Sequence, residues 1–207
     1  MHYIPFDMEQ IVTRGRPREF NADDALAAAL SVFWSKGYEG ASLADLTEAM
    51  GITRPSLYAA FGNKEQLFRQ ALDLYECEKM AYIGYALEQP TARAVAQSLL
   101  EGAIAIYTGE SDPRGCLSVI SSTACGTEAE CIRQEVNARS KELNKIIVAR
   151  MQRSIEEGDF NRPVDAQAIA TYLRAIAQGL SVQAGAGATR EELATVVEQT
   201  IAMWPGK

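Results

Sequence analysis

The chain has 207 residues, 47% of them apolar, and a formal net charge of −7. This length is enough to bury a sizeable core. The longest charge-free run covers residues 175–189, which is shorter than the roughly 18 apolar residues that a membrane-spanning helix needs. The first residues lack the basic start and apolar middle of a secretory signal. We therefore expect a cytoplasmic protein with no membrane partner.

The cysteine and histidine content argues against histidine-dependent catalytic sites and histidine-based metal sites. The single histidine is His2, and the four cysteines, at positions 77, 116, 125 and 131, form no CxxC pair. A Cys–His couple and a His-based metal site are therefore not expected. In a cytoplasmic chain the thiols should be reduced rather than joined in disulfides. We expect no metal and no cofactor.

The overall charge gives no support to nucleic-acid binding. Residues 1–66 carry 6 Lys or Arg against 9 Asp or Glu. Arg14, Arg16 and Arg18 form a local positive cluster ahead of the first predicted helix, and this cluster could contact DNA or could be a solvated tail. Any DNA contact must therefore depend on local geometry rather than on the net charge.

The spacing of apolar residues predicts an all-α protein, because they recur every three or four positions and no alternating β-branched run interrupts them. Asn21 should cap the first helix, and Ser42 opens a capping box for the second. Thr53 should cap a third, short helix, and Asn63 begins a long helix that runs from residue 64 to about residue 87. Further helices are predicted near residues 91–108, 115–125, 128–157, 165–184 and 189–203.

Residues 42–62 combine a short helix, a glycine turn and a second short helix, which is the arrangement of a helix-turn-helix. The apolar residues that should pack inward are Leu43, Leu46, Met50, Ile52, Leu57 and Phe61. The side chains left facing outward are Arg54, Ser56, Ala59 and Ala60. Arg54 could form a bidentate pair with guanine. The hydroxyl and cationic groups that suit phosphate oxygens are Ser42, Thr53, Ser56, Tyr58 and Lys64.

Three stretches carry a resemblance to a known family. They are GYEGASLADL at 37–46, MGITRPSLYAAF at 50–61 and NKEQLF at 63–68. With these stretches, residues 19–70 resemble the DNA-binding head of the tetracycline-repressor (TetR/AcrR) family. The preceding RGRPR at 14–18 is a frequent lead-in in that family. The chain length and the predicted all-helical body are similar too.

The resemblance implies a three-helix head joined by a long helix to a C-terminal helical body that binds a ligand and forms the dimer. The implied parts are a flexible basic arm at 1–18, a helix-turn-helix DNA-binding domain at 19–66 and a ligand-binding and dimerisation domain at 67–207. The implied function is transcription regulation, with repression as the family default. The implied partners are double-stranded operator DNA, an unknown small-molecule inducer and a second copy of the chain.

The resemblance also assigns DNA-contacting residues. It implies that the groove is faced by Arg54, Pro55, Ser56, Tyr58 and Ala59. It implies that the DNA backbone is contacted by Ser42, Thr53 and Lys64. From the local positive charge of the arm we also expect Arg16 and Arg18 to contact DNA. The chain departs from many members at positions 59 and 60, where alanines stand in place of larger side chains. Base recognition would then depend on Arg54 and on contacts with thymine methyl groups.

The last two predicted helices carry broad apolar stripes, which could serve a protomer core, a dimer interface or both. The resemblance favours an interface, and a dimer would place two recognition helices on half-sites one helical turn apart. The residues that we expect in this interface are Tyr172, Ile176, Gly179, Leu180, Val196, Val197, Thr200, Ile201 and Trp204.

The family also implies a ligand cavity among the central helices. The candidate lining residues, each of which could equally be simple core, are Tyr82, Tyr85, Ile104, Tyr107, Cys116, Leu117, Ile120, Met151 and Tyr172. A ligand that prefers the conformation with splayed heads would shift the dimer away from DNA. The long helix that begins at Lys64 is the expected lever.

Cys116 allows an alternative trigger. Similar Gly-Cys-Leu strings occur in a branch of the family in which some members sense electrophiles or oxidants. Arg114 and a nearby helix start would favour the thiolate of Cys116, and Cys125 or Cys131 could resolve an oxidised form. The other interpretation is a small buried thiol that acts as an apolar side chain.

Two further functions compete with a regulator. An enzyme would need a glycine-rich phosphate loop, a recognisable carboxylate pair or a Cys–His couple, and the sequence contains none of these. A helical small-molecule-binding protein that has lost its DNA affinity would keep the same pattern, and a DNA-binding measurement separates it from a regulator.

Overall fold

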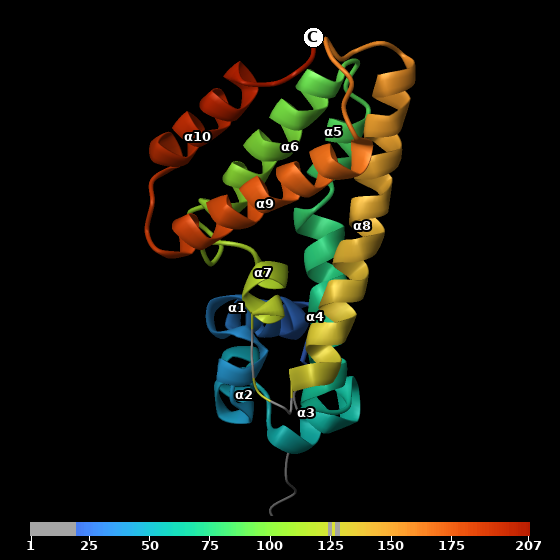
Figure 1. Ribbon diagram of the computed structural model, residues 1–207. Coiled ribbons are helices and arrows are strands. Elements are labelled where there is room, and N and C mark those ends of the chain that lie inside the picture. The colour runs from blue at the N-terminus through green and yellow to red at the C-terminus, as the bar shows by residue number, and fades with distance from the viewer. Residues whose placement is uncertain (1–19, 124–125, 127–128) are drawn as a thin grey trace, which may run out of the picture.

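A computed structural model describes residues 20–123, 126 and 129–207, which form ten α-helices and no β-strand (Figure 1). The helices are α1 (Ala22–Gly40), α2 (Leu43–Met50), α3 (Arg54–Phe61), α4 (Lys64–Lys79), α5 (Tyr82–Leu87), α6 (Ala92–Tyr107), α7 (Leu117–Ser122), α8 (Glu130–Glu156), α9 (Ala166–Gly185) and α10 (Arg190–Ala202). The predicted all-α architecture is confirmed. Within the described ranges, none of these helices is both long enough and apolar enough to span a bilayer.

The head consists of α1, α2, α3 and the first turns of α4, at the lower end of the molecule in Figure 1. The predicted caps are confirmed, because Asn21, Ser42, Thr53 and Asn63 each accept a hydrogen bond from a backbone N–H of the helix that follows. In α1 the backbone breaks at Gly37, whose φ of 69° is accessible to glycine at little cost. The last residues of α1 therefore change direction towards α2.

An aromatic core joins the head to α4. The rings of Phe33 and Phe68 meet edge to face with 5.1 Å between their centroids, and those of Trp34 and Tyr75 do so at 4.8 Å. All four side chains are buried, and such edge-to-face pairs add to the free energy of burying large rings. As a result α4 is fixed to α1.

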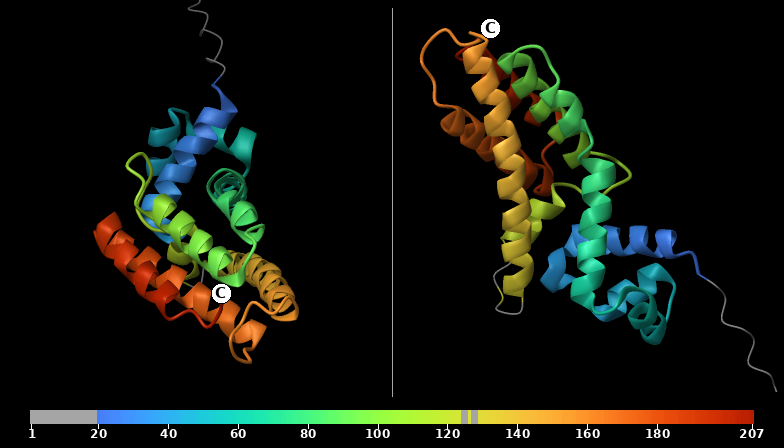
Figure 2. Two further views of the ribbon diagram at one scale, coloured as in Figure 1. Left: turned by 90° about the horizontal axis from the view of Figure 1, so that it is seen from above. Right: turned by 90° about the vertical axis from the view of Figure 1, so that its right-hand side faces the viewer.

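The body contains α5 to α10. The long helix α8 runs from the level of the head to the far end of the body, where the C-terminus lies (Figures 1 and 2). Helix α9 packs against α6 on one side and α8 on the other, and α10 covers α6. The short helix α7 lies between body and head, in contact with α1 and α8.

The expected single helix over residues 64–87 is wrong. Helix α4 ends at Lys79, and after Met80 the chain turns into the separate helix α5. Neither proline nor glycine stands at this break, so the cause is tertiary: α5 turns aside to pack on α6, where Gly102 leaves room for the ring of Tyr82. The helix predicted near 115–125 is also shorter, because α7 covers only Leu117–Ser122.

Candidate nucleic-acid interface and effector cavity

Helix α3 is held in place by its apolar face and by a glycine turn. Gly51 adopts a left-handed conformation with φ 65° and ends α2, so that α3 can start three residues later. Leu57 and Phe61 of α3 are buried, as are Leu46 and Met50 of α2. Burial of these four side chains fixes which side of α3 faces outward.

The outward side of α3 presents a cation and small side chains. Arg54, Pro55, Ala59 and Ala60 are exposed, and 49% of Tyr58 is accessible. Arg54 takes part in no ion pair with another residue of the described ranges. Its guanidinium, at the first position of α3, is therefore available to an external acceptor.

The hydroxyl groups at the starts of α2 and α3 form hydrogen bonds within the helix caps. Thr53 Oγ1 lies 3.0 Å from Ser56 Oγ and accepts the N–H of Ser56 at 3.4 Å. Ser42 Oγ donates to Asp45 Oδ2 at 2.7 Å. Ser42 and Thr53 are exposed, whereas Ser56 is half-buried. These caps orient the first turns of α2 and α3.

Two lysines of the head, Lys36 and Lys64, contact other side chains of the head, and sequence reasoning missed both contacts. Lys36 Nζ forms an ion pair with Asp45 Oδ1 at 2.6 Å. The hydrogen bonds from Lys36 and then from Ser42 hold the pKa of Asp45 far below its ordinary value. Lys64 Nζ lies 4.5 Å from the centroid of the Tyr38 ring, in a cation–π contact. The predicted contacts of Arg16 and Arg18 lie outside the described residues.

A cavity of about 600 Å³ opens between α4, which joins the head to the body, and the body helices. Most of its wall is apolar, with side chains from α5, α6, α7, α8 and α9, and it includes Met80, Ile83, Leu99, Leu143 and Leu173. A cavity of this size and character suits a small organic molecule.

The predicted lining residues fall into two groups. Tyr82, Tyr107 and Cys116 line the cavity. The others lie elsewhere: Leu117 and Met151 are buried in the core, Ile120 of α7 is next to Gly37 of α1, Tyr85 is 68% exposed, Tyr172 is exposed on α9, and Ile104 lines a second pocket between α6 and α10.

Cys116 connects the cavity wall with the head. The Tyr75 hydroxyl donates to Cys116 Sγ at 3.3 Å, and the Trp34 ring of α1 lies against Tyr75. Trp34 Nε1 also donates to the carbonyl of Gly115 at 3.1 Å. Burial, reinforced by the charge that the Cys116 thiolate would carry, raises the pKa of Tyr75, so its hydroxyl keeps its proton.

The expected roles of the residues near Cys116 need one correction. Arg114 was expected to favour the thiolate, but its guanidinium donates to the carbonyls of Ala184 and Ala188 at the end of α9. Of the proposed resolving cysteines, Cys131 is exposed on α8, and position 125 lies outside the described residues.

The expected interface residues lie both inside the protomer and on its surface. Leu180, Val197, Thr200, Ile201 and Trp204 are buried within the protomer. Ile176 and Val196 are half-buried, and Tyr172 and Gly179 are exposed. Val182 of α9, which sequence reasoning did not select, is 61% exposed.

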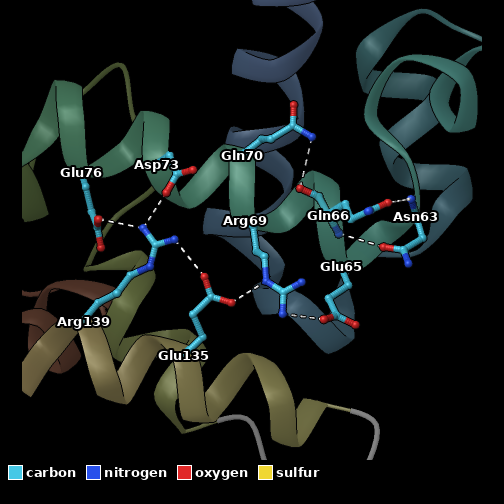
Figure 3. Close-up of polar contacts among 9 residues, drawn as sticks. All are labelled: Asn63, Glu65, Gln66, Arg69, Gln70, Asp73, Glu76, Glu135 and Arg139. Carbon is cyan, nitrogen blue, oxygen red and sulfur yellow. Dashed lines mark hydrogen bonds and ion pairs between the residues drawn. The ribbon is translucent and has the colours of Figure 1, made fainter.

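Ion pairs join α4 to α8 in a network that sequence reasoning also missed (Figure 3). Arg139 of α8 binds Asp73 and Glu76 of α4, and Arg69 of α4 binds Glu135 of α8. The signal was present in the sequence: charged residues at 65, 69, 73 and 76 follow one face of a helix. The partners of this charged face are Glu135 and Arg139 of α8, which the structure places opposite it.

Comparison with known families and proteins agrees with this geometry. Residues 25–71 match the model of the tetR family of bacterial regulatory proteins, and residues 94–200 match the tetracyclin repressor-like C-terminal domain. The chain is 33% identical to the HTH-type transcriptional repressor ComR of Escherichia coli K12, over 93% of each chain. It is 29% identical to the HTH-type transcriptional repressor BdcR of the same organism, over 86% of each chain.

A solved structure extends the comparison to the whole fold. The chain is 44% identical to a cysteine mutant of the TetR family transcriptional regulator CifR, solved in complex with 26-bp double-strand operator DNA. The TM-score is 0.86, and the match covers 92% of this chain and 100% of that chain. The chain therefore belongs to the tetR family of bacterial regulatory proteins, which are DNA-binding transcription regulators and not enzymes.

Proposed function

We propose that the chain is a homodimeric repressor that binds a palindromic operator through α3 and leaves it when a small molecule occupies the cavity. Its place of action is the cytoplasm, where bacterial operator DNA lies. The observation that carries the proposal is the exposed guanidinium of Arg54 on a helix fixed by a glycine turn, in a chain 44% identical to one solved on operator DNA.

Arg54 would recognise a base, while its neighbours hold the helix in register. An arginine can donate two hydrogen bonds to O6 and N7 of guanine in the major groove. Ala59 and Ala60 are small enough to let α3 approach the bases and to contact thymine methyl groups. The N–H groups at the starts of α2 and α3 would meet phosphates.

The exposed side of α9 would form the dimer interface. Tyr172, Gly179 and Val182 are accessible there, and residues 175–189 carry no charge. A charge-free helix face with small residues allows close packing of a second copy without desolvating ions. The dimer would set two α3 helices on half-sites roughly 34–36 Å apart.

The cavity would hold the effector. A small molecule can release the protein only by as much as it prefers the DNA-incompetent conformation. Because the cavity lies between α4 and the body helices, a molecule bound there contacts the helix that carries the head.

The direct test is binding of a labelled duplex from the promoter next to the gene for this chain. We expect nanomolar affinity, a steep loss of affinity with added salt, and little competition from a shuffled duplex of the same composition. Equal affinity for the shuffled duplex would reject the proposed operator recognition, and loss of all DNA binding would favour a small-molecule-binding protein.

A second candidate trigger is covalent capture of an electrophile by Cys116. The specific observation is that its sulfur lies on the cavity wall and accepts a hydrogen bond from Tyr75, which packs on Trp34 of the head. A group added to this sulfur would displace the Tyr75 hydroxyl and disturb the junction of α1 and α4.

N-ethylmaleimide tests this trigger, because a thiol adds across its double bond and the thiol proton ends on the neighbouring carbon. A variant with Cys77, Cys125 and Cys131 replaced by serine should release the duplex when treated. Replacement of Cys116 by serine in that background should abolish the release. Equal release without Cys116 would rule out this trigger.

A further inference from the structure

We infer that Arg139 is the positioning residue that reports cavity occupancy to the DNA-binding head, through a ladder of ion pairs between α4 and α8. The ladder consists of Glu65, Arg69, Asp73 and Glu76 on α4 with Glu135 and Arg139 on α8. This inference rests on the proposed function, since it names the regulation of the same cavity.

The upper end of the ladder lies at the cavity. Both Arg139 and Glu76 line it. Arg139 Nη1 lies 2.6 Å from Asp73 Oδ1 and 2.9 Å from Glu76 Oε2, and Arg139 Nη2 lies 2.8 Å from Glu135 Oε1 (Figure 3). One guanidinium therefore touches the cavity and joins three carboxylates from two helices.

The lower end of the ladder lies at the head. Glu135 Oε2 accepts from Arg69 Nε at 2.5 Å, and Arg69 Nη2 lies 2.6 Å from Glu65 Oε1 in the first turn of α4. Figure 3 shows Arg69 between Glu135 on one side and Glu65 on the other. Through this bond the first turn of α4 is held to α8.

The first turn of α4 is itself joined to α3. Asn63 and Gln66 form a reciprocal capping box, and Gln70 Nε2 donates to the carbonyl of Phe61 at 3.3 Å. Phe61 is the last residue of α3. A shift of α4 relative to α8 would therefore carry α3 with it.

The ladder connects α4 and α8 although their backbones lie mostly apart. The two helix backbones approach each other closely at few points, and the cavity separates their upper parts. A single exposed ion pair adds little stability. Here the central side chains, Glu135 and Arg139, are less than one third exposed, and each serves two or more partners, so loss of one weakens several bonds.

A ligand can act on this ladder by competing for Arg139. An oxygen acceptor such as a carboxylate, on an otherwise apolar molecule, would take hydrogen bonds that now go to Asp73 and Glu76. The apolar wall would bind the rest of the molecule. Loss of these bonds leaves Arg69–Glu135 as the remaining ion pair of the ladder between α4 and α8. The upper part of α4 can then shift relative to α8, and the heads leave the spacing that the operator requires.

The test breaks the ladder without touching the cavity. Glu135→Gln and Arg69→Gln remove the same bond from opposite helices, and neither residue lines the cavity. Each should weaken operator binding about 5-fold or more, within the usual range of allosteric coupling, and the double variant should be no weaker than the single ones. Lys145→Gln, which removes an exposed pair within α8, is the matched control and should bind as the unmodified chain does.

Because the ligand is unidentified, a substitution that fills part of the cavity is used to imitate an occupied cavity. Ser140→Phe adds a ring to the cavity wall next to Arg139 and should weaken operator binding in the unmodified chain. In the Glu135→Gln background it should add no further loss, because Glu135 no longer links Arg139 to Arg69 and a change at the cavity is not passed to the head. Circular dichroism and light scattering confirm that each variant is folded and dimeric.

The inference is overturned if Glu135→Gln and Arg69→Gln bind the operator like the unmodified chain, or if Ser140→Phe has the same effect with and without Glu135. If the unmodified chain itself fails to bind the operator, the proposed function has failed instead.

Discussion

Arg54 is the side chain on which sequence recognition depends in this account. Arg54→Ala removes the two donors that would face guanine in the proposed complex, and we expect it to lower the preference for operator over shuffled DNA by about 1–3 kcal/mol. Arg54→Lys keeps the charge but not the paired donors, so affinity for shuffled DNA should be kept while preference is lost. Competition binding at two salt concentrations measures both quantities. An unchanged preference in Arg54→Ala would mean that another residue recognises the bases.

Glu135 gives the stability of the molecule a defined pH dependence. Partial burial raises the pKa of its carboxyl group, but hydrogen bonds from Arg69 and Arg139 outweigh burial and lower the pKa below the ordinary value of 4.5. A lowered folded-state pKa means that the stabilisation is complete above the ordinary value and is lost as the pH falls through the folded-state value.

We therefore expect Glu135→Gln to be less stable than the unmodified chain at pH 7, and the difference to shrink as the pH falls below 4.5. Urea unfolding at a series of pH values measures this difference. A difference that stays constant down to pH 3 would mean that the charge of Glu135 does not contribute through these pairs.

Residue-scale prediction from sequence worked for local interactions. The caps at Asn21, Ser42, Thr53 and Asn63 were predictable because their partners lie two or three residues away. The bonds from Arg139 to Asp73 and Glu76 of α4 were not, because they join residues more than 60 positions apart. Their geometry depends on how α4 and α8 are placed, which no local pattern determines.

At the scale of elements, a buried arginine holds the end of α5 to α8. Only 6% of Arg150 is exposed, and it donates to the carbonyls of Leu87 at 2.9 Å and Gln89 at 2.7 Å. These carbonyls end α5 and have no further turn of helix to bind them. Burial lowers the pKa of Arg150 from its ordinary value, so the charge is retained at a cost that these bonds offset.

Arg150→Met should therefore lower the free energy of unfolding by about 1–3 kcal/mol, since it keeps most of the volume but leaves the carbonyls of two half-buried residues without these donors. Arg153→Met, on the same helix and largely exposed, should change it by less than about 0.5 kcal/mol. Urea unfolding of both variants measures these changes. Similar losses in the two would show that the carbonyl bonds are not the source of the stability.

Element boundaries were predictable where the chain carries its own signals. Gly51 and Gly62 end α2 and α3 as expected, because glycine readily adopts the positive φ that both residues have. The break between α4 and α5 was missed because it has no local signal, and Tyr82 is drawn to α6 by packing alone. Tertiary packing overrides helix propensity at this site.

For the whole molecule, the proposed dimer makes Gly179 a sensitive position. A Cβ added there meets no atom within 4 Å apart from its own stretch of helix, and Gly179 is exposed, so Gly179→Glu should leave each protomer folded. In a dimer it would bury an unpaired charge, which costs several kcal/mol. We expect monomers in light scattering at micromolar concentration and loss of operator binding, whereas Gln152→Glu, at an exposed position of α8, should stay dimeric. A dimeric Gly179→Glu variant would place the interface elsewhere.

The fold class and the helix-turn-helix were predictable from the sequence, because periodicity, caps and the residue 50–68 pattern all agree. The cavity was predictable only in part: Tyr82, Tyr107 and Cys116 line it, whereas Met151 and Leu117 are core. A cavity is defined by the space between helices, and apolar spacing within one helix cannot distinguish a cavity wall from a packed core.

The central claim, sequence-specific binding by paired α3 helices, is tested most directly by sequencing the genomic fragments that the purified full-length chain retains. The account predicts a small set of fragments that share an inverted repeat, with half-sites about one helical turn apart. Retained fragments with no shared sequence, or no retained fragments, would contradict it.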